Sequence, residues 1–150
     1  MANVGKWNTH SATVALLTTE LNSLADATMS AASAAVANHT NLDMYADFEI
    51  VLASLSPTAG AFVTLYIWEA IDDGTNYPAQ SDADLRLTAT QVLCTVPIGT
   101  TASTAQRIVV RNVLLPPASF KVKLDNRAGV ALNASGNTVK MNPYNVNLNG

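Results

Sequence analysis

The sequence has little charge, one cysteine and two histidines, and each shortage excludes a kind of chemistry. Eight Lys and Arg against eleven Asp and Glu give a formal net charge of -3, and charged residues make up 13% of the 150. Nucleic-acid binding needs clustered basic residues that neutralise phosphates, and those here are scattered. We therefore expect no nucleic-acid partner. Because Cys94 is the only cysteine, neither an intrachain disulfide nor a thiolate metal cluster can form. We expect Cys94 to be a small apolar residue of the core.

Long apolar runs are missing too. No stretch of eighteen apolar residues occurs, and the first residues lack a charged segment followed by an apolar one, which is the pattern of a secretion signal. The sequence thus predicts no membrane partner and indicates folding in a cytoplasm. Hydrophobic residues still make up 49%, enough at this length for one domain with its own core. Solubility must then depend on neutral Ala, Thr, Ser and Asn, and such a surface associates readily.

Alternation of apolar and polar residues dominates the chain from Tyr45 onward. Phe48, Ile50 and Leu52 share one face of a predicted strand, as a half-buried strand requires. Short strands between Gly, Pro or Asn breaks and without intervening helices predict an all-β fold, an antiparallel β-sandwich that is jelly-roll-like. The further strands are expected at residues 61–70, 91–98, 105–115, 119–126, 129–133 and 138–148.

Two of these strands carry specific expectations. In residues 119–126, Phe120, Val122 and Leu124 form the apolar face, and the residues between them are expected to face water or a neighbour; these are Lys121, Lys123 and Asp125. The Asn-rich residues 142–150 alternate in the same way and predict a terminal strand that finishes the sheet.

The N-terminal part of the chain is ambiguous. We expect residues 1–20 to be an arm that orders on binding and residues 21–150 to be the β-sandwich domain. Helical spacing of leucines favours a short helix or turn at residues 18–23. Residues 28–36, rich in Ser and Ala, suit a helix and a closely packed strand about equally well, and both remain open.

Catalytic chemistry lacks a base. A Ser or Cys nucleophile needs one within hydrogen-bond reach, and the only histidines, His10 and His39, lie in the N-terminal quarter as expected surface or loop residues. Their spacing does not match a zinc motif either. Asp47 and Glu49 alternate on the polar side of a strand, which is typical of a solvated face and not of a glycosidase pair. We expect no enzymatic activity and no cofactor.

One acidic cluster could bind calcium through oxygen ligands if its loop folded back on itself. It lacks the glutamate-terminated pattern of an EF-hand, and it consists of Asp72, Asp73, Asp82 and Asp84.

Residues 61–70 are apolar on both sides of the predicted strand. A lone two-layer sandwich keeps one face of each sheet in water, so the second face needs a cover. Aromatic residues are enriched at interfaces, and this face carries Phe62, Tyr66 and Trp68. We favour a subunit interface there, and cover by the chain's own N-terminal segment is the alternative.

A family resemblance lies in Asn-Leu-Asp-Met-Tyr-Ala-Asp-Phe-Glu-Ile-Val-Leu at 41–52, Pro-Thr-Ala-Gly at 57–60 and Asp-Gly-Thr-Asn-Tyr at 73–77, with an aromatic strand between the last two. Together these segments resemble virion structural proteins of tailed bacteriophages and are most similar to small head decoration proteins, also called cement proteins. The likeness covers roughly residues 20–148 as a pattern of turns and strands.

The resemblance implies a protein on the outer surface of a capsid, made in the host bacterial cytoplasm and without an active site. It implies a homotrimer that bridges subunits of the major capsid protein and stabilises the head, with Trp7 in an anchoring arm. Two alternatives stay open. One is a tail, neck or fibre-associated virion protein, and the other is a carbohydrate-binding module in which Trp68, Tyr66 or Tyr77 stacks on a sugar ring.

Overall fold

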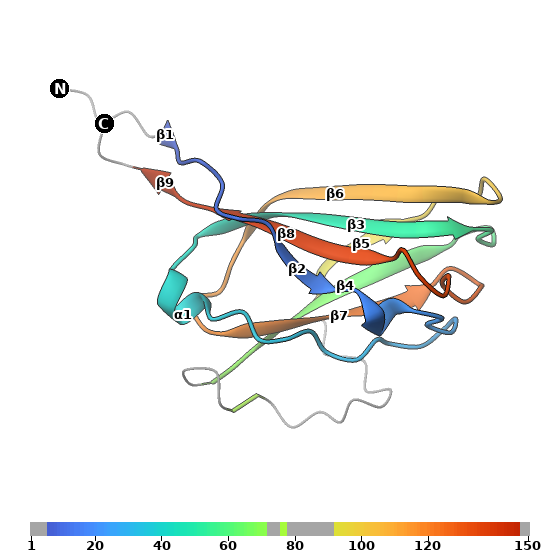
Figure 1. Cartoon of the computed structure of the whole chain (residues 1–150), viewed down its shortest axis with the longest axis horizontal. Coiled ribbons are helices and arrows are strands. Elements are labelled where there is room, and N and C mark those ends of the chain that lie inside the picture. The colour runs from blue at the N-terminus through green and yellow to red at the C-terminus, as the bar shows by residue number, and fades with distance from the viewer. Residues whose placement is uncertain (1–5, 72–75, 78–91, 148–150) are drawn as a thin grey trace.

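The computed structural model describes residues 6–71, 76–77 and 92–147. Two antiparallel sheets pack face to face, and a two-stranded ribbon projects from one end of the sandwich (Figure 1). The all-β sandwich expected from the sequence is confirmed. The elements are β1 (Lys6–Trp7), β2 (Val14–Leu17), a 3-10 turn η1 (Thr19–Leu21), a helix α1 (Asn38–Asn41), β3 (Tyr45–Leu55), β4 (Phe62–Glu69), β5 (Val92–Pro97), β6 (Thr104–Leu114), β7 (Phe120–Arg127), β8 (Thr138–Tyr144) and β9 (Val146–Asn147). No helix among the described residues has the length and apolarity needed to cross a membrane.

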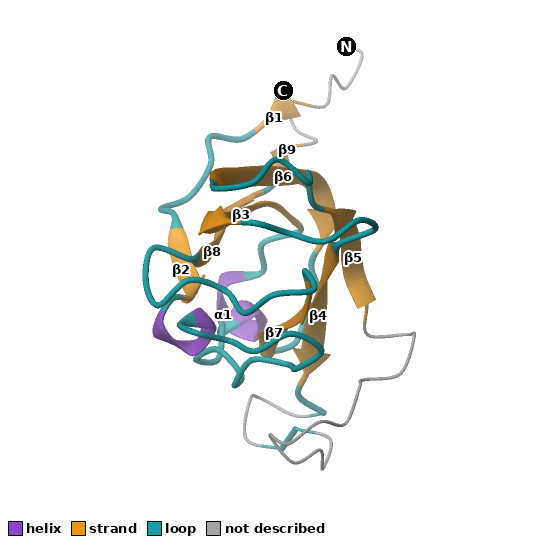
Figure 2. Ribbon diagram, turned by 90° about the vertical axis from the view of Figure 1, so that its right-hand side faces the viewer, coloured by secondary structure: helices purple, strands orange, loops and turns teal. Residues whose placement is uncertain are grey.

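The strands pair in a nested order, the first with the last. β1 pairs with β9, β2 with β8, β3 with β6 and β4 with β5, all antiparallel. The segment between η1 and α1 takes the matching place beside β7. One sheet therefore has the order β2-β8-β3-β6 and the other the order β5-β4-β7. With that segment as the eighth member, this is the strand arrangement of a jelly roll (Figure 2).

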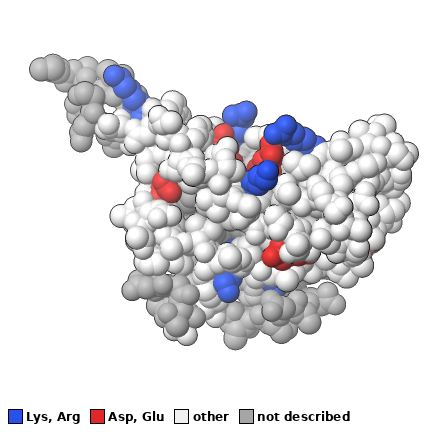
Figure 3. Space-filling view, viewed as in Figure 1, with Lys and Arg blue, Asp and Glu red and all other residues white. Residues whose placement is uncertain are grey.

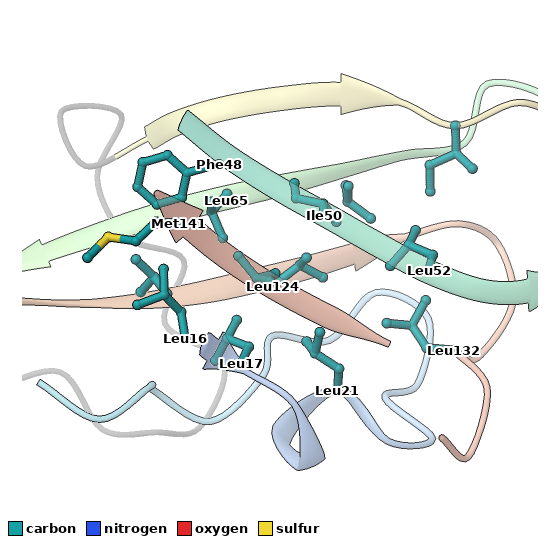
Figure 4. Packing of buried hydrophobic residues seen from close by; sticks show 14 of the residues in the cluster. Leu16, Leu17, Leu21, Phe48, Ile50, Leu52, Leu65, Leu124, Leu132 and Met141 are labelled. Atoms are coloured by element: carbon teal, nitrogen blue, oxygen red, sulfur yellow. The ribbon is translucent and has the colours of Figure 1, made fainter. Parts of the chain in front are cut away.

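The core lies between the two sheets, where the inward side chains of facing strands meet (Figure 4). β3 alternates as predicted, since Phe48, Ile50 and Leu52 are fully buried. Leu65 of β4 and Leu124 of β7 fill the same interior from the second sheet. Burying an apolar side chain of this size stabilises the fold by roughly 1.5–3 kcal/mol, so the alternation itself positions the two sheets.

The domain begins earlier than residue 21, so the predicted boundary of the N-terminal arm is wrong. β2 pairs with β8 in the four-stranded sheet, and Leu16, Leu17 and Leu21 are buried in the core. The spacing of Val14, Leu17 and Leu21 is helical, but the first two lie in β2 and the third in η1. The predicted short helix or turn at residues 18–23 is confirmed by η1.

The Ser/Ala-rich residues 28–36 form an extended edge beside β7 and no regular helix. The Ser30 amide donates to the Leu124 carbonyl at 2.8 Å, and the Leu124 amide donates to Ser30 Oγ at 3.0 Å. Ser33 makes the same pair of bonds with Val122, at 2.9 and 3.0 Å. Each serine hydroxyl thus replaces a backbone carbonyl as acceptor, and three residues of this segment match two residues of β7.

The predicted strand at residues 129–133 is wrong, and the one predicted at 138–148 is interrupted after Tyr144. Residues 129–133 form a turn, because Gly129 has a φ of +74° and the buried Asn126 amide Nδ2 donates to the Val130 carbonyl at 2.9 Å. The predicted strand at 138–148 breaks at Asn145, whose Oδ1 accepts the Met44 amide at 2.8 Å. Beyond this break β9 leaves the sheet and pairs with β1.

Candidate interaction surface

The four residues predicted to form an interface do not lie on one surface. Trp68 is 4% exposed and Tyr66 is also buried, whereas Trp7 is 67% exposed and Phe62 only partly so. Trp7 lies in the ribbon, and Phe62 begins β4, where it opposes Arg127 of β7. Only Trp7 therefore offers most of its side chain to a partner.

Tyr66 and Trp68 are covered by the chain's own N-terminal segment. Met29 and Ala32 pack against the pair formed by Tyr66 and Trp68, and Lys123 Nζ lies 4.4 Å from the Trp68 ring centroid. The expectation that another subunit covers Tyr66 and Trp68 is wrong, and the alternative cover is the one observed. The second apolar face of β4 thus belongs to the interior of this chain.

The polar side of β7 is also covered. Lys123 and Asp125, which were expected to face water or a neighbour, are both buried. Asp125 accepts a hydrogen bond from Arg127 Nε at 2.9 Å, and Lys123 places its ammonium over an aromatic face, an arrangement that is worth more when it is shielded from water. Charge is therefore tolerated here because each group has an electrostatic partner.

The ribbon of β1 and β9 stands on a cluster of aromatic rings. The Trp7 ring centroid lies 5.5 Å from that of Tyr144 and 6.3 Å from that of Tyr45, both edge to face. Tyr45 and Tyr144 stack at 5.7 Å, since they are direct neighbours across β3 and β8. The contacts fix the root of the ribbon while most of the Trp7 surface stays in solvent.

Three more large apolar side chains are exposed around this cluster. Leu42 is 61% exposed, Met44 45% and Leu114 68%. Leu114 lies directly opposite Tyr45 across β3 and β6, and the Met44 carbonyl accepts the Leu115 amide at 2.9 Å. We call Trp7, Leu42, Met44 and Leu114 the apolar end. Sequence reasoning missed the last three, although Leu42 and Met44 alternate with polar residues just before a strand.

Leu42 is exposed in a backbone conformation that leucine disfavours. It is the C-cap of α1 with a φ of 53°, in the left-handed region where glycine or asparagine is usual. A β-carbon there costs roughly 1–2 kcal/mol. Neither its exposure nor its backbone geometry favours leucine at this position for stability.

An apolar groove of about 400 Å³ opens beside the apolar end, along the edge where β5 and β6 meet. Its walls are apolar apart from one carboxylate, Glu69, and Leu114 belongs to both the groove and the apolar end. The lining residues are Ile67, Glu69, Val92, Leu93, Val113, Leu114, Leu115, Pro116 and Pro117.

The outer face of the four-stranded sheet gathers acidic and basic side chains, near the top of the view in Figure 3. Arg107 Nε donates to Glu49 Oε2 at 2.7 Å, and Arg111 Nη1 donates to Asp47 Oδ2 at 3.2 Å. The Asn112 amide also donates to Asp47, at 2.9 Å. Asp47 and Glu49 are thus paired with guanidinium groups across β3 and β6 and are not simply solvated.

The residues considered for catalysis lie in structural contacts. His10 Nε2 is 3.8 Å from Asp47 Oδ2 at the surface. His39 Nδ1 lies 2.6 Å from Ser119 Oγ, a contact between residues 80 apart that sequence reasoning missed. Ser119 is 2% exposed, which leaves its hydroxyl no access to a substrate. Burial raises the pKa of Cys94 to about 11, so its thiol stays protonated and unreactive near neutral pH.

The four aspartates of the predicted calcium cluster lie outside the described residues. Within the part of the chain that the structure describes, no three His, Cys, Asp or Glu side chains group so as to hold a metal ion.

No protein-family model and no curated protein matches the chain. Among solved structures it is similar to a chain in "Structure of infectious bursal disease virus Gt strain", with 13% sequence identity and a TM-score of 0.31. The match covers 95% of this chain and 29% of that chain. A likeness this weak carries no argument about function.

Proposed function

We propose that the chain is a non-enzymatic structural protein of a virus particle, a capsid decoration or cement protein that binds the outer capsid surface and bridges major capsid protein subunits. The apolar end is the observation that supports this most. Exposed apolar patches on soluble proteins mark interaction sites, and Leu42 keeps its place there against backbone preference. The resemblance of residues 41–77 to head decoration proteins supplies the identity of the partner.

The carbohydrate-binding alternative has little support at the aromatic residues considered for it. Stacking on a sugar needs an exposed ring face, and Lys123 lies over Trp68 while Lys121 lies 4.4 Å from the Tyr77 ring centroid. Trp68 and Tyr66 are also buried. An assembly role needs only exposed apolar surface, which the apolar end provides.

Binding to particles tests the proposal. Purified chain is mixed with expanded capsids that lack it, and the bound fraction is measured after sedimentation. We expect saturable binding that falls more than tenfold for Leu42→Asp and for Met44→Asp, because a charge placed in an apolar contact must be desolvated without a partner.

A matched control is Val109→Asp. Val109 is 46% exposed on β6 and faces outward opposite Glu49, away from the apolar end, so this variant should bind as the unmodified chain does. Absence of binding by the unmodified chain would remove the proposal, and so would equal binding by all variants. Electron cryomicroscopy of decorated particles then distinguishes density on the head from density at the tail or neck, which would favour the alternative virion location.

A further inference from the structure

Two surface features of the chain are complementary in charge and in polarity. One half is the projecting ribbon, with Lys6 beside the largely exposed Trp7. The other half is the apolar groove, whose single charged lining residue is Glu69. Among the described residues, neither Lys6 nor Glu69 takes part in an ion pair. A basic, aromatic projection thus stands beside an acidic, apolar recess.

We propose that the ribbon of one copy docks into the apolar groove of a second copy, with Trp7 against the apolar walls and Lys6 beside Glu69. This inference rests on the proposed function and extends it, because it names a second copy of this chain as the partner that fills the groove.

Strand geometry allows both contacts at once. Successive residues of a strand point to opposite sides, so when Trp7 enters the groove, Lys6 stays at its mouth. Glu69 ends β4, is exposed and lines the groove, so its carboxylate is open to solvent and to a partner. The flexible four-carbon stem of lysine lets the ammonium reach a carboxylate there. Tryptophan supplies the largest burial that one side chain can give to such a contact.

The contact joins two different surfaces and is therefore heterologous. Heterologous contacts close into rings when the rotation between copies allows it, and otherwise continue as filaments. The ribbon and the groove lie at the same end of the sandwich, because Tyr45 contacts Trp7 and pairs with Leu114. A rotation axis close to this end would bring each ribbon to the neighbouring groove, as a closed trimer requires.

The contact is small. A stable specific interface buries roughly 1,200–2,000 Å² in total, and one tryptophan contributes at most about 250 Å² of this. We therefore expect concentration-dependent association of the free chain in the micromolar range, which the spacing of sites on a particle would strengthen by raising the effective concentration.

Sedimentation velocity of the full chain tests the contact in the absence of any particle. We expect Trp7→Ala to weaken self-association more than tenfold, and Lys6→Glu or Glu69→Lys each to weaken it severalfold. The double variant carrying Lys6→Glu and Glu69→Lys should recover most of the association, because the ion pair is restored with its signs exchanged. Val109→Ala removes exposed apolar surface elsewhere on β6 and should leave association unchanged. Circular dichroism of each variant checks that the fold is kept.

The outcomes separate this inference from the proposed function. A chain that stays monomeric at high concentration but binds particles overturns the ribbon contact and leaves the decoration role. Self-association that survives Trp7→Ala, or charge reversals that do not rescue each other, also overturns it. Self-association with this mutational pattern, but without particle binding, supports the ribbon contact and removes the decoration role instead.

Discussion

Trp68 and Trp7 occupy opposite environments in the same chain. Trp68 is enclosed by residues from the N-terminal segment and by Lys123, whereas Trp7 touches two tyrosine rings and is otherwise in solvent. Both residues looked like interface aromatics in the sequence. An apolar strand face must be covered, but the sequence of the strand does not tell whether the same chain or a partner covers it. A projecting aromatic residue such as Trp7 is left largely uncovered by its own chain.

Trp68→Ala should lower the unfolding free energy more than any other variant considered, because Trp68 is the enclosed tryptophan of the pair. Removing a large buried aromatic costs about 3–5 kcal/mol of unfolding free energy, from lost burial and the cavity left behind. Urea denaturation followed by circular dichroism measures the loss. A change below 1 kcal/mol, on the order of that for a surface substitution, would contradict the burial of Trp68.

Ser33→Ala tests the segment that encloses Trp68. The Val122 amide, now bonded to Ser33 Oγ, would be left buried without an acceptor, at a cost of about 1–3 kcal/mol. Hydrogen exchange at Val122 should accelerate by the corresponding factor. Ser135→Ala is the matched control, since Ser135 is exposed. Equal stability of the two variants would show that the hydroxyl is not needed as an acceptor.

Leu42→Gly should separate stability from binding at the exposed end. Glycine adopts a φ of 53° without the steric cost of a β-carbon, and we expect a gain of about 0.5–1 kcal/mol in unfolding free energy. Particle binding should fall at the same time, because the exposed side chain is lost. A variant that is both less stable and fully active would contradict the assignment of Leu42 to the interaction surface.

Trp7→Ala should have the smallest effect on folding and so sharpens the contrast with Trp68. The ring is mostly in solvent, and its edge-to-face contacts contribute less than about 1 kcal/mol to a surface position. Thermal denaturation should therefore show little change while self-association is lost. A loss of stability as large as that of Trp68→Ala would place Trp7 in the folded core.

Several parts of this architecture could be predicted from single segments. β3 and β7 follow from the alternation of apolar and polar residues, because a strand in one of two packed sheets places every second residue inward. The irregular edge at residues 28–36 could not, because its serines replace backbone acceptors only when β7 lies alongside. The positions of Asn38, Asn126 and Asn137 could not be predicted from single segments either. Asparagine was expected at the surface, where it would support solubility, yet these three residues are buried.

Two of the buried asparagines hold loops against distant parts of the chain. Asn126 Nδ2 donates to the carbonyls of Leu24 and Val130, which holds the turn at residues 129–133 against the N-terminal segment. Asn137 Oδ1 accepts the Ala53 amide at 2.9 Å, across a loop that local sequence cannot relate to β3. A side-chain amide becomes a structural crosslink only when the fold brings distant backbone groups to it.

By itself, the sequence determined an all-β chain with one core and few charges, because these depend on the period of apolar residues and on composition. The tertiary structure decided which apolar residues stay exposed. Trp68 is covered because the N-terminal segment lies along β7. Leu42, Met44 and Leu114 lie at the same end of the sandwich as Trp7, because Tyr45 contacts Trp7 and pairs with Leu114. Exposure depends on contacts between segments far apart in the chain, and the sequence of a single segment does not determine those contacts.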